Sequence, residues 1–106
     1  MTNENADSLD LVFTALADKT RRALVNKLAK SEELTITELT QGFSMSLAAV
    51  SKHIKVLERA KLIRRRIDGR IHYISLAPER LGIALDWISI YRNFWQSRIN
   101  ELNKIL

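Results

Sequence analysis

The side chains in this chain that are best suited to chemistry are basic, and their natural partner is a phosphate group. Between Ser46 and His72, only Glu58 and Asp68 oppose eight lysines and arginines, so these 27 residues carry a net charge of +6. The basic residues are Lys52, Lys55, Arg59, Lys61, Arg64, Arg65, Arg66 and Arg70. The whole chain carries +5, so the remainder is close to neutral. This concentration predicts a surface that binds nucleic-acid phosphates, although a solvated charged face has a similar composition.

Catalytic and metal-binding chemistry is not predicted. The chain has no cysteine, which excludes disulfides, thiolate metal ligands and a cysteine nucleophile. Ser51 and His53 are two positions apart in a helical segment, where their side chains diverge and cannot form part of a triad. His53 and His72 fall on different elements and do not make a metal site. We expect no enzyme activity, cofactor or metal, and His53 should be either half-buried and hydrogen-bonded or a phosphate contact.

The hydrophobic spacing predicts a mostly helical α+β fold with five helices and one β-hairpin. A length of 106 residues suits one domain. We expect a flexible tail at residues 1–7, a folded core at 8–77 and a long helix at 78–106. Helix-capping residues are expected at the starts of the first four helices: Ser8, Asp18, Thr35 and Ser46. The polar N-terminus and the lack of a membrane span indicate a soluble, cytoplasmic protein.

The order of the elements predicts a DNA-binding motif. A short link from Gly42 to Met45 joins the third and fourth helices, and a hairpin follows the fourth. The strand-like segments 62–67 and 70–76 flank Asp68-Gly69, a dipeptide typical of two-residue hairpin loops. Two helices and a hairpin in this order are typical of a winged helix-turn-helix, in which the second helix of the pair enters the major groove.

The fourth helix should have one face on the core and one on DNA. Its apolar stripe is formed by Leu47, Val50, Ile54 and Leu57. On the opposite face, small side chains allow a close approach to base edges, and Lys52 can reach a guanine edge or a phosphate. The expected DNA contacts, with two from the hairpin, are Ser46, Ala48, Ala49, Ser51, Lys52, His53, Lys55, Arg66 and Arg70.

Three motifs between residues 11 and 76 resemble the ArsR-type winged-helix repressors of prokaryotes. Ala17-Asp18-Lys19-Thr20-Arg21-Arg22 is similar to the A-D-x-T-R-R opening of that family. Residues 46–57 are similar to its recognition-helix signature, and Asp68-Gly69-Arg70 with Tyr73 and Leu76 resembles its wing. The resemblance implies a repressor that dimerises through its first and last helices and acts on its own or a neighbouring promoter.

One departure from the family pattern concerns metal sensing. Metal-sensing members carry a cysteine pair after Glu-Leu on the third helix, whereas here Glu38-Leu39 is followed by Thr40-Gln41-Gly42. The segment from Pro78 onward contains no histidine that could replace them. The resemblance therefore implies no metal here, and it leaves open whether a small molecule or an antagonist protein acts as the effector.

The last helix is apolar on two sides, which predicts a second partner besides its own core. One stripe contains Leu81, Leu85, Ile88, Trp95, Ile99, Leu102 and Leu106, and the other contains Ile83, Trp87, Ile90 and Phe94. We expect a homodimer, with one continuous core helix in a thick monomer as the alternative. The expected interface residues are Leu9, Val12, Phe13, Leu85, Ile88, Tyr91, Trp95, Ile99 and Leu102.

The predicted function is sequence-specific binding of double-stranded DNA by a dimeric transcriptional repressor. Its two recognition helices would enter successive major grooves, so the operator should be an inverted repeat. The alternative is a winged-helix module that docks an acidic protein through the same basic face.

Overall fold

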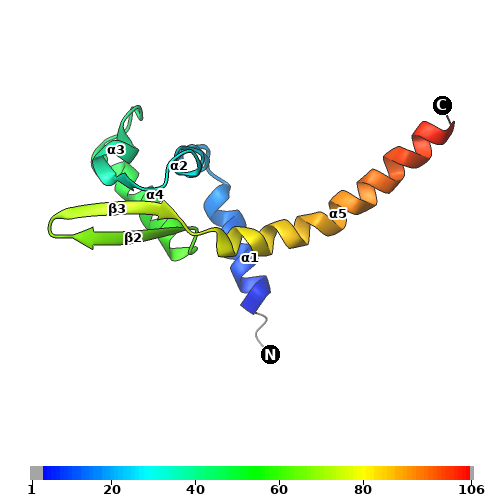
Figure 1. The fold of residues 1–106 in the computed structure, drawn as a ribbon, viewed down its shortest axis with the longest axis horizontal. Coiled ribbons are helices and arrows are strands. Elements are labelled where there is room, and N and C mark those ends of the chain that lie inside the picture. Colours follow the sequence, from blue (N-terminus) through cyan, green and yellow to red (C-terminus); the bar gives the residue numbers. More distant parts are fainter. Residues whose placement is uncertain (1–3, 106) are drawn as a thin grey trace.

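In the computed structural model, which describes residues 4–105, five helices and three strands form a winged helix-turn-helix, as the order of elements predicted (Figure 1). The elements are α1 (Glu4–Leu16), α2 (Lys19–Ala29), β1 (Leu34–Thr35), α3 (Ile36–Thr40), α4 (Leu47–Arg59), β2 (Ile63–Asp68), β3 (Ile71–Leu76) and α5 (Pro78–Ile105).

The core lies between the helices α1, α2 and α4 and the sheet. Leu24 and Leu28 of α2, Ile54 and Leu57 of α4, and Ile74 of β3 are all buried, with at most 1% of their surface exposed. Burying a leucine or isoleucine side chain stabilises the fold by roughly 1.5–3 kcal/mol. The apolar spacing that predicted the helices therefore also supplies the packing that holds α4 in place.

Three of the four expected helix caps are confirmed. The Asp18 carboxylate accepts a hydrogen bond from the backbone N–H of Arg21, and the Ser46 hydroxyl accepts one from Ala49. Thr35 and Glu38 form a reciprocal capping box at the start of α3. These side chains satisfy amides that have no partner within their own helix.

The prediction for Ser8 was wrong. Helix α1 begins at Glu4, so residues 4–7 are helical instead of part of a tail, and residues 1–3 lie outside the described part of the chain. Ser8 is buried inside the helix, and its hydroxyl accepts a hydrogen bond from Arg80 of α5. A capping serine bonds its own backbone, whereas this one bonds a distant helix, which the local sequence does not encode.

The hairpin turn lies one residue later than expected. Asp68 pairs with Ile71, so the two-residue loop is Gly69-Arg70 and not Asp68-Gly69. Gly69 has a φ of +63° and Arg70 does not have a positive φ, as in a type II′ turn, where glycine takes the first central position. The short strand β1 was not predicted; it pairs with β3 and gives the sheet order β1-β3-β2.

The apolar stripe of α4 is buried except at its first residue. Val50, Ile54 and Leu57 are fully buried, but Leu47 is 60% exposed, which corrects its assignment to the core. Helical spacing places Leu47 on the same side as the other three, yet the first turn of α4 extends beyond the packed residues. An apolar side chain therefore lies exposed at the start of this helix.

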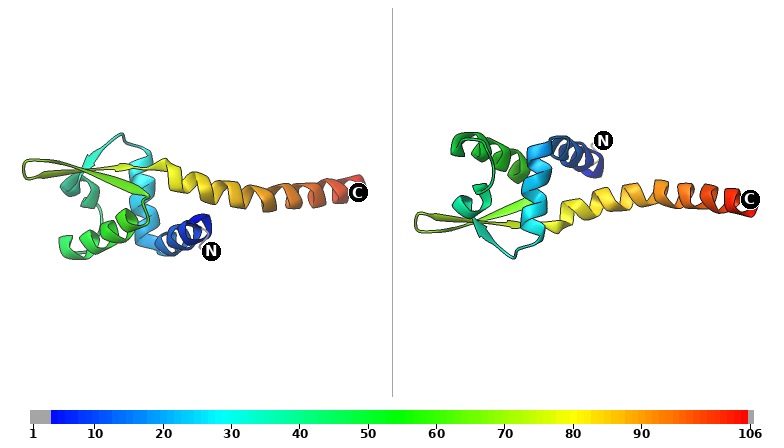
Figure 2. Two further views of the ribbon diagram at one scale, coloured as in Figure 1. Left: turned by 90° about the horizontal axis from the view of Figure 1, so that it is seen from below. Right: turned by 90° about the horizontal axis from the view of Figure 1, so that it is seen from above.

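Helix α5 packs on the core only near its start and then leaves the body of the molecule (Figure 2). Ala84 is buried and Leu81 packs against the core, whereas Leu85 is 60% exposed and Trp95 is 62% exposed. The alternative of one continuous core helix in a thick monomer is therefore wrong, because the apolar side chains of α5 beyond Ala84 are largely exposed. The protein measures 61 Å along its longest axis and 22 Å along its shortest.

The expected dimer interface contains one buried residue. Val12 has none of its surface exposed and belongs to the core, so it cannot contact a partner. Leu9, three positions before it, is partly buried against the core. Phe13 is 36% exposed and packs edge-on against Trp87 of α5, with ring centres 5.6 Å apart. The α1 helix thus turns one side to the core and Phe13 to α5.

Candidate nucleic-acid interface

The link between α3 and α4 is held by a lysine from α2. The Lys27 Nζ donates hydrogen bonds to the carbonyls of Glu38 at 2.7 Å and Gln41 at 2.8 Å, at the end of α3. A cation at a helix C-terminus satisfies free carbonyls and interacts favourably with the helix dipole. Gly42 follows with a φ of +87°, a conformation that glycine adopts without strain. These contacts fix the direction in which the chain leaves α3 and enters α4.

The first turns of α4 present small and basic side chains. Ala48 is exposed, Ala49 is half-buried, and Lys52 and Lys55 are exposed. Neither lysine makes an ion pair or a side-chain hydrogen bond with another described residue. Two unpaired cations one turn apart on the exposed face of α4 form a surface suited to phosphates and base edges.

His53 lies between α4 and α2, half-buried. Its Nδ1 is 3.2 Å from a guanidinium nitrogen of Arg21 and 3.8 Å from a carboxylate oxygen of Asp18. The pKa of Asp18 is lowered, chiefly by the hydrogen bond from the Arg21 backbone; burial opposes this lowering, and the neighbouring Arg21 and His53 side chains add to it. One ring nitrogen of His53 thus faces the protein.

Arg21 and Arg22 lie near the N-terminus of α2, where a cation interacts unfavourably with the helix dipole. Both side chains instead donate hydrogen bonds to carbonyls at the end of α1. Arg21 donates to the carbonyls of Ala15 at 2.6 Å and Thr14 at 3.1 Å. Arg22 donates to the carbonyl of Leu16 at 2.7 Å. The last turn of α1 has no basic residue of its own, so these arginines cap its C-terminus.

The three consecutive arginines of β2 are all paired with acids, which the sequence analysis missed. Arg64 pairs with Glu79 of α5. Arg65 reaches both carboxylate oxygens of Glu58 on α4, at 3.0 and 3.2 Å. The alternation along the strand places Arg65 on the α4 side and its neighbours on the other side.

The third of them, Arg66, is held by a carboxylate and a ring. It donates to both oxygens of Glu33, at 2.7 and 3.1 Å, and its guanidinium lies 4.1 Å from the centre of the Tyr73 ring. The hydrogen bonds from Arg66 lower the pKa of Glu33 and raise that of Arg66. Glu33 adjoins β1, the strand that was not predicted, so this pair had no signal in the local sequence.

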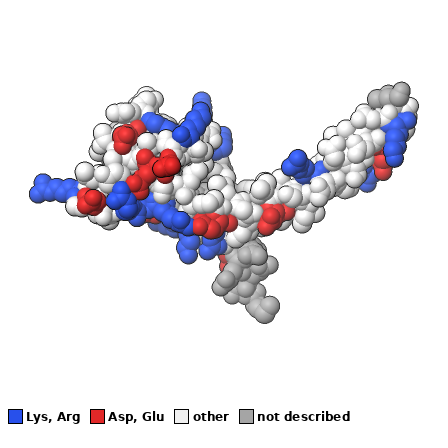
Figure 3. All heavy atoms as spheres, viewed as in Figure 1, with Lys and Arg blue, Asp and Glu red and all other residues white. Residues whose placement is uncertain are grey.

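Arg70 differs from these arginines because it occupies the exposed hairpin loop. No ion pair among the side chains of residues 7–105 involves it. Basic side chains extend from the tip of the hairpin, while acidic and basic groups alternate over the rest of this face (Figure 3). The free positive charge is therefore smaller than the sequence indicated and is concentrated at α4 and the hairpin tip.

The helix pair and the hairpin tip lie at one end of the molecule, opposite the far end of α5 (Figure 2). Among the described residues, no group of three or more histidine, aspartate or glutamate side chains is arranged to hold a metal. Within the same part of the chain, no helix is long and apolar enough to cross a membrane.

Comparisons with known proteins agree with this architecture. A family model described as a helix-turn-helix domain matches residues 16–66. The HTH-type transcriptional regulator Rv2034 of Mycobacterium tuberculosis is 42% identical over 75 residues, which cover 71% of this chain and 69% of the relative. The HTH-type transcriptional regulator YuzN of Bacillus subtilis is 34% identical over 86 residues, which cover 74% and 94%.

A solved structure is similar over most of its length. The crystal structure of an ArsR family transcriptional regulator matches with a TM-score of 0.78 at 33% identity, covering 87% of this chain and 94% of that one. An ArsR-like transcriptional regulator from Rhodococcus has a TM-score of 0.74 at 21% identity, and at this identity the likeness concerns the fold alone.

Proposed function

This chain belongs to the ArsR family of winged helix-turn-helix regulators and is a DNA-binding transcriptional regulator, and on that premise we propose that it is a dimeric repressor of an inverted-repeat operator. The observation that carries the proposal is the pair of free cations, Lys52 and Lys55, on α4, at the same end of the molecule as the Gly69-Arg70 loop. The protein-docking alternative has no support from the relatives, which are named as transcriptional regulators.

The proposed contacts follow from which side chains are exposed and have no ion-pair partner. Lys52 reads base edges, because it is exposed and unpaired on α4, while Lys55 and Arg70 neutralise phosphates. Arg66 reaches DNA only by exchanging Glu33 for a phosphate. The remaining members of the proposed interface are Ser46, Ala48, Ala49, Ser51 and His53.

The proposed dimer joins two copies through α1 and α5. The far part of α5 exposes apolar side chains that its own chain does not cover, and such a surface is stable in water when a partner buries it. The proposed interface residues are Leu9, Phe13, Leu85, Ile88, Tyr91, Trp95, Ile99 and Leu102. A two-fold axis would place the recognition helices about 34–36 Å apart, which is one turn of DNA.

We also propose that the chain acts without catalysis, cofactor or metal, in the cytoplasm, where the DNA is. Binding alone achieves repression, since a dimer on a promoter excludes the polymerase.

The test is a fluorescence-anisotropy titration of the duplex upstream of this protein's own gene, with random duplex as competitor at two salt concentrations. We expect two chains per duplex and a complex that resists the competitor. Random duplex should bind more weakly and with a steeper loss in salt. Equal binding of both duplexes at both salt concentrations would overturn the operator proposal.

A further inference from the structure

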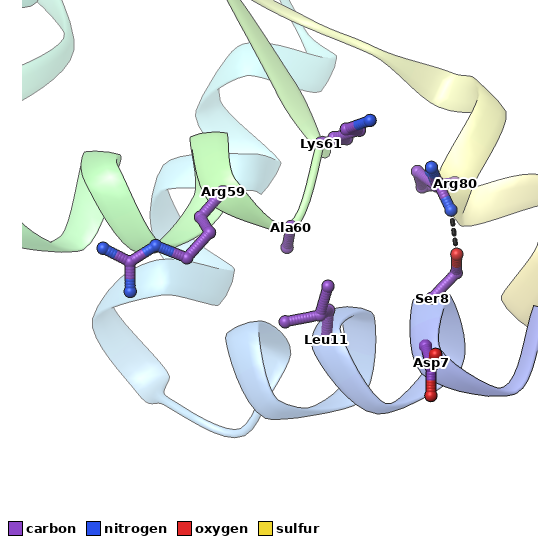
Figure 4. Close-up of a pocket in the computed structure, with 7 residues that line it drawn as sticks. All are labelled: Asp7, Ser8, Leu11, Arg59, Ala60, Lys61 and Arg80. Atoms are coloured by element: carbon purple, nitrogen blue, oxygen red, sulfur yellow. Dashed lines mark hydrogen bonds between the residues drawn. The ribbon is translucent and has the colours of Figure 1, made fainter. Parts of the chain in front are cut away.

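A polar hollow of about 410 Å³ lies where α1, the end of α4 and the start of α5 meet. It is separate from the DNA-facing turns of α4. Leu11 of α1 and Ala60 at the end of α4 form its apolar wall, and Ser8, Lys61 and Arg80 supply its polar groups (Figure 4). Figure 4 also shows that the Arg59 guanidinium and the Asp7 carboxylate point away from Lys61 and Arg80.

Lys61 has a backbone conformation that glycine normally adopts. Its φ is +60°, the only positive value at a non-glycine residue in the described part of the chain. The N–H of Lys61 donates to the carbonyl of Glu58 and that of Leu62 to Leu57, both at 3.0 Å, which is the Schellman ending of α4. A lysine at this position costs energy that glycine would not, which indicates that its side chain has a use.

Arg80 brings a second cation to the same side of the hollow. It is half-buried and donates a hydrogen bond to the Ser8 hydroxyl, which holds its guanidinium in place. Lys61 and Arg80 also line an adjoining hollow of about 260 Å³, whose one acid, Glu79, pairs with Arg64. Among residues 7–105, whose side chains the structure describes, neither Lys61 nor Arg80 makes an ion pair. Asp7 also lines the hollow but points away from both cations, and two neighbouring like charges that have no ion-pair partner favour an anion between them.

We propose that this hollow binds a small organic anion. An oxyanion headgroup would accept hydrogen bonds from Lys61 and Arg80, and a short apolar body would pack on Leu11 and Ala60. The site joins the end of the recognition helix to α1 and α5, so an occupant sets the angle between the DNA-reading and the proposed dimerising elements. Binding would then change the affinity for DNA, a consequence that rests on the proposed function.

The test of the site is a titration of the full chain with phenyl phosphate, followed by the amide NMR shifts of Leu11, Ala60 and Lys61. Inorganic phosphate and phenol, titrated separately, probe the headgroup and the apolar body. In Lys61→Gly we expect affinity for phenyl phosphate to fall about tenfold, the loss of one charge-assisted hydrogen bond. The same substitution should preserve or raise the melting temperature, because glycine relieves the positive φ.

Lys104→Gln, near the end of α5, is the matched control, since it removes one positive charge far from the hollow. It should bind phenyl phosphate as the wild type does. The proposal is overturned if Lys61→Gly binds as tightly as the wild type, if both variants weaken equally, or if the shifted amides lie outside the hollow.

A second arm measures operator affinity with saturating phenyl phosphate, against sodium chloride of equal ionic strength. We expect the anisotropy midpoint to move severalfold in the wild type and to stay unchanged in Lys61→Gly. Phenyl phosphate binding with an unmoved midpoint would overturn the regulatory role alone. Phenyl phosphate binding by a chain that does not bind the operator duplex would instead overturn the proposed repressor function.

Discussion

At the scale of single residues, the basic side chains around the helix pair and the hairpin differ in what they contact. Some bind carbonyls at the ends of helices: Arg21, Arg22 and Lys27. Others pair with acids around the hairpin: Arg64, Arg65 and Arg66. Lys52, Lys55 and Arg59 on α4 and Arg70 on the hairpin loop have no such acid partner among residues 7–105, and we propose Lys52, Lys55 and Arg70 as DNA contacts. A net charge counted along the sequence does not separate these roles, because it ignores where each charge is neutralised.

Lys52 and Arg70 should therefore give different losses when each is replaced by alanine. Lys52→Ala should weaken operator binding by about 1–3 kcal/mol and relax sequence preference, because it removes a base contact. Arg70→Ala should weaken operator and random DNA alike and reduce the salt slope by about 1. Anisotropy titrations on both duplexes measure this, and an equal loss on the two duplexes for Lys52→Ala would refute base reading.

Leu47 is expected to contact a thymine, since it is 60% exposed on the first turn of the recognition helix. Replacing thymine by uracil in the operator removes the C5-methyl group that an apolar side chain meets in the major groove. We expect this replacement to weaken the wild type and to leave Leu47→Ser unaffected. If the uracil operator weakens both proteins equally, Leu47 does not read that methyl group. Val50→Ser is a poor control here, because Val50 is fully buried and its loss would damage the core.

At the scale of elements, ion pairs hold the hairpin on both of its faces. Arg65 joins it to α4 through Glu58, and Arg66 joins it to the segment before β1 through Glu33. These ion pairs fix the orientation of the hairpin relative to α4. The distance between the two parts of the proposed DNA surface is therefore fixed as well. Because Arg66 is bound to Glu33, its guanidinium is not free for a proposed DNA contact.

The Glu33–Arg66 ion pair should make a pH-dependent contribution to the stability of the fold. The pKa of Glu33 is lowered in the folded state from its ordinary value of 4.5, so its ionised form stabilises the fold above that pH. We expect Glu33→Gln to lower the melting temperature at neutral pH. The difference from the wild type should disappear as the pH falls through 4.5 and below, where Glu33 becomes protonated. A difference that stays constant with pH would show that the carboxylate charge contributes nothing.

At the scale of the whole molecule, the direction of α5 separates the proposed DNA surface from the proposed dimer surface. The residues proposed to face DNA lie at one end, and an uncovered apolar helix extends at the other (Figure 1). Exposed aromatic and aliphatic side chains along α5 give a second copy a long surface to cover, and each contact made through a two-fold axis occurs twice.

Ile99→Asp should break the proposed dimer without unfolding the chain. Ile99 is 48% exposed on the part of α5 beyond the body, so a charge there is tolerated in a monomer but not in an apolar interface. Sedimentation should show monomers at a concentration where the wild type is dimeric, with the melting transition of the core retained and operator affinity at least tenfold lower. Asn93→Asp, which adds the same charge on the polar side of α5, should remain dimeric. Wild-type protein that sediments as a monomer would refute the dimer outright.

The local elements of this protein were determined by the sequence alone. Helix caps at Asp18, Thr35 and Ser46, the span of α4 and the presence of a hairpin all follow from residues a few positions apart, where spacing and side-chain type decide the backbone. The helix-turn-helix order followed from these elements, and so did the family resemblance that the comparisons confirmed.

Only the tertiary structure decided which side chains are free. Residues 33 positions apart form the Glu33–Arg66 pair, Ser8 bonds Arg80 across 72 positions, and neither has a signal in local spacing. The same holds for Val12, buried although it shares a helix with the exposed Phe13, and for Leu47, exposed although its helical phase matches the core. Periodicity assigns a side to a residue, but burial depends on whether another element of the fold extends far enough to cover it.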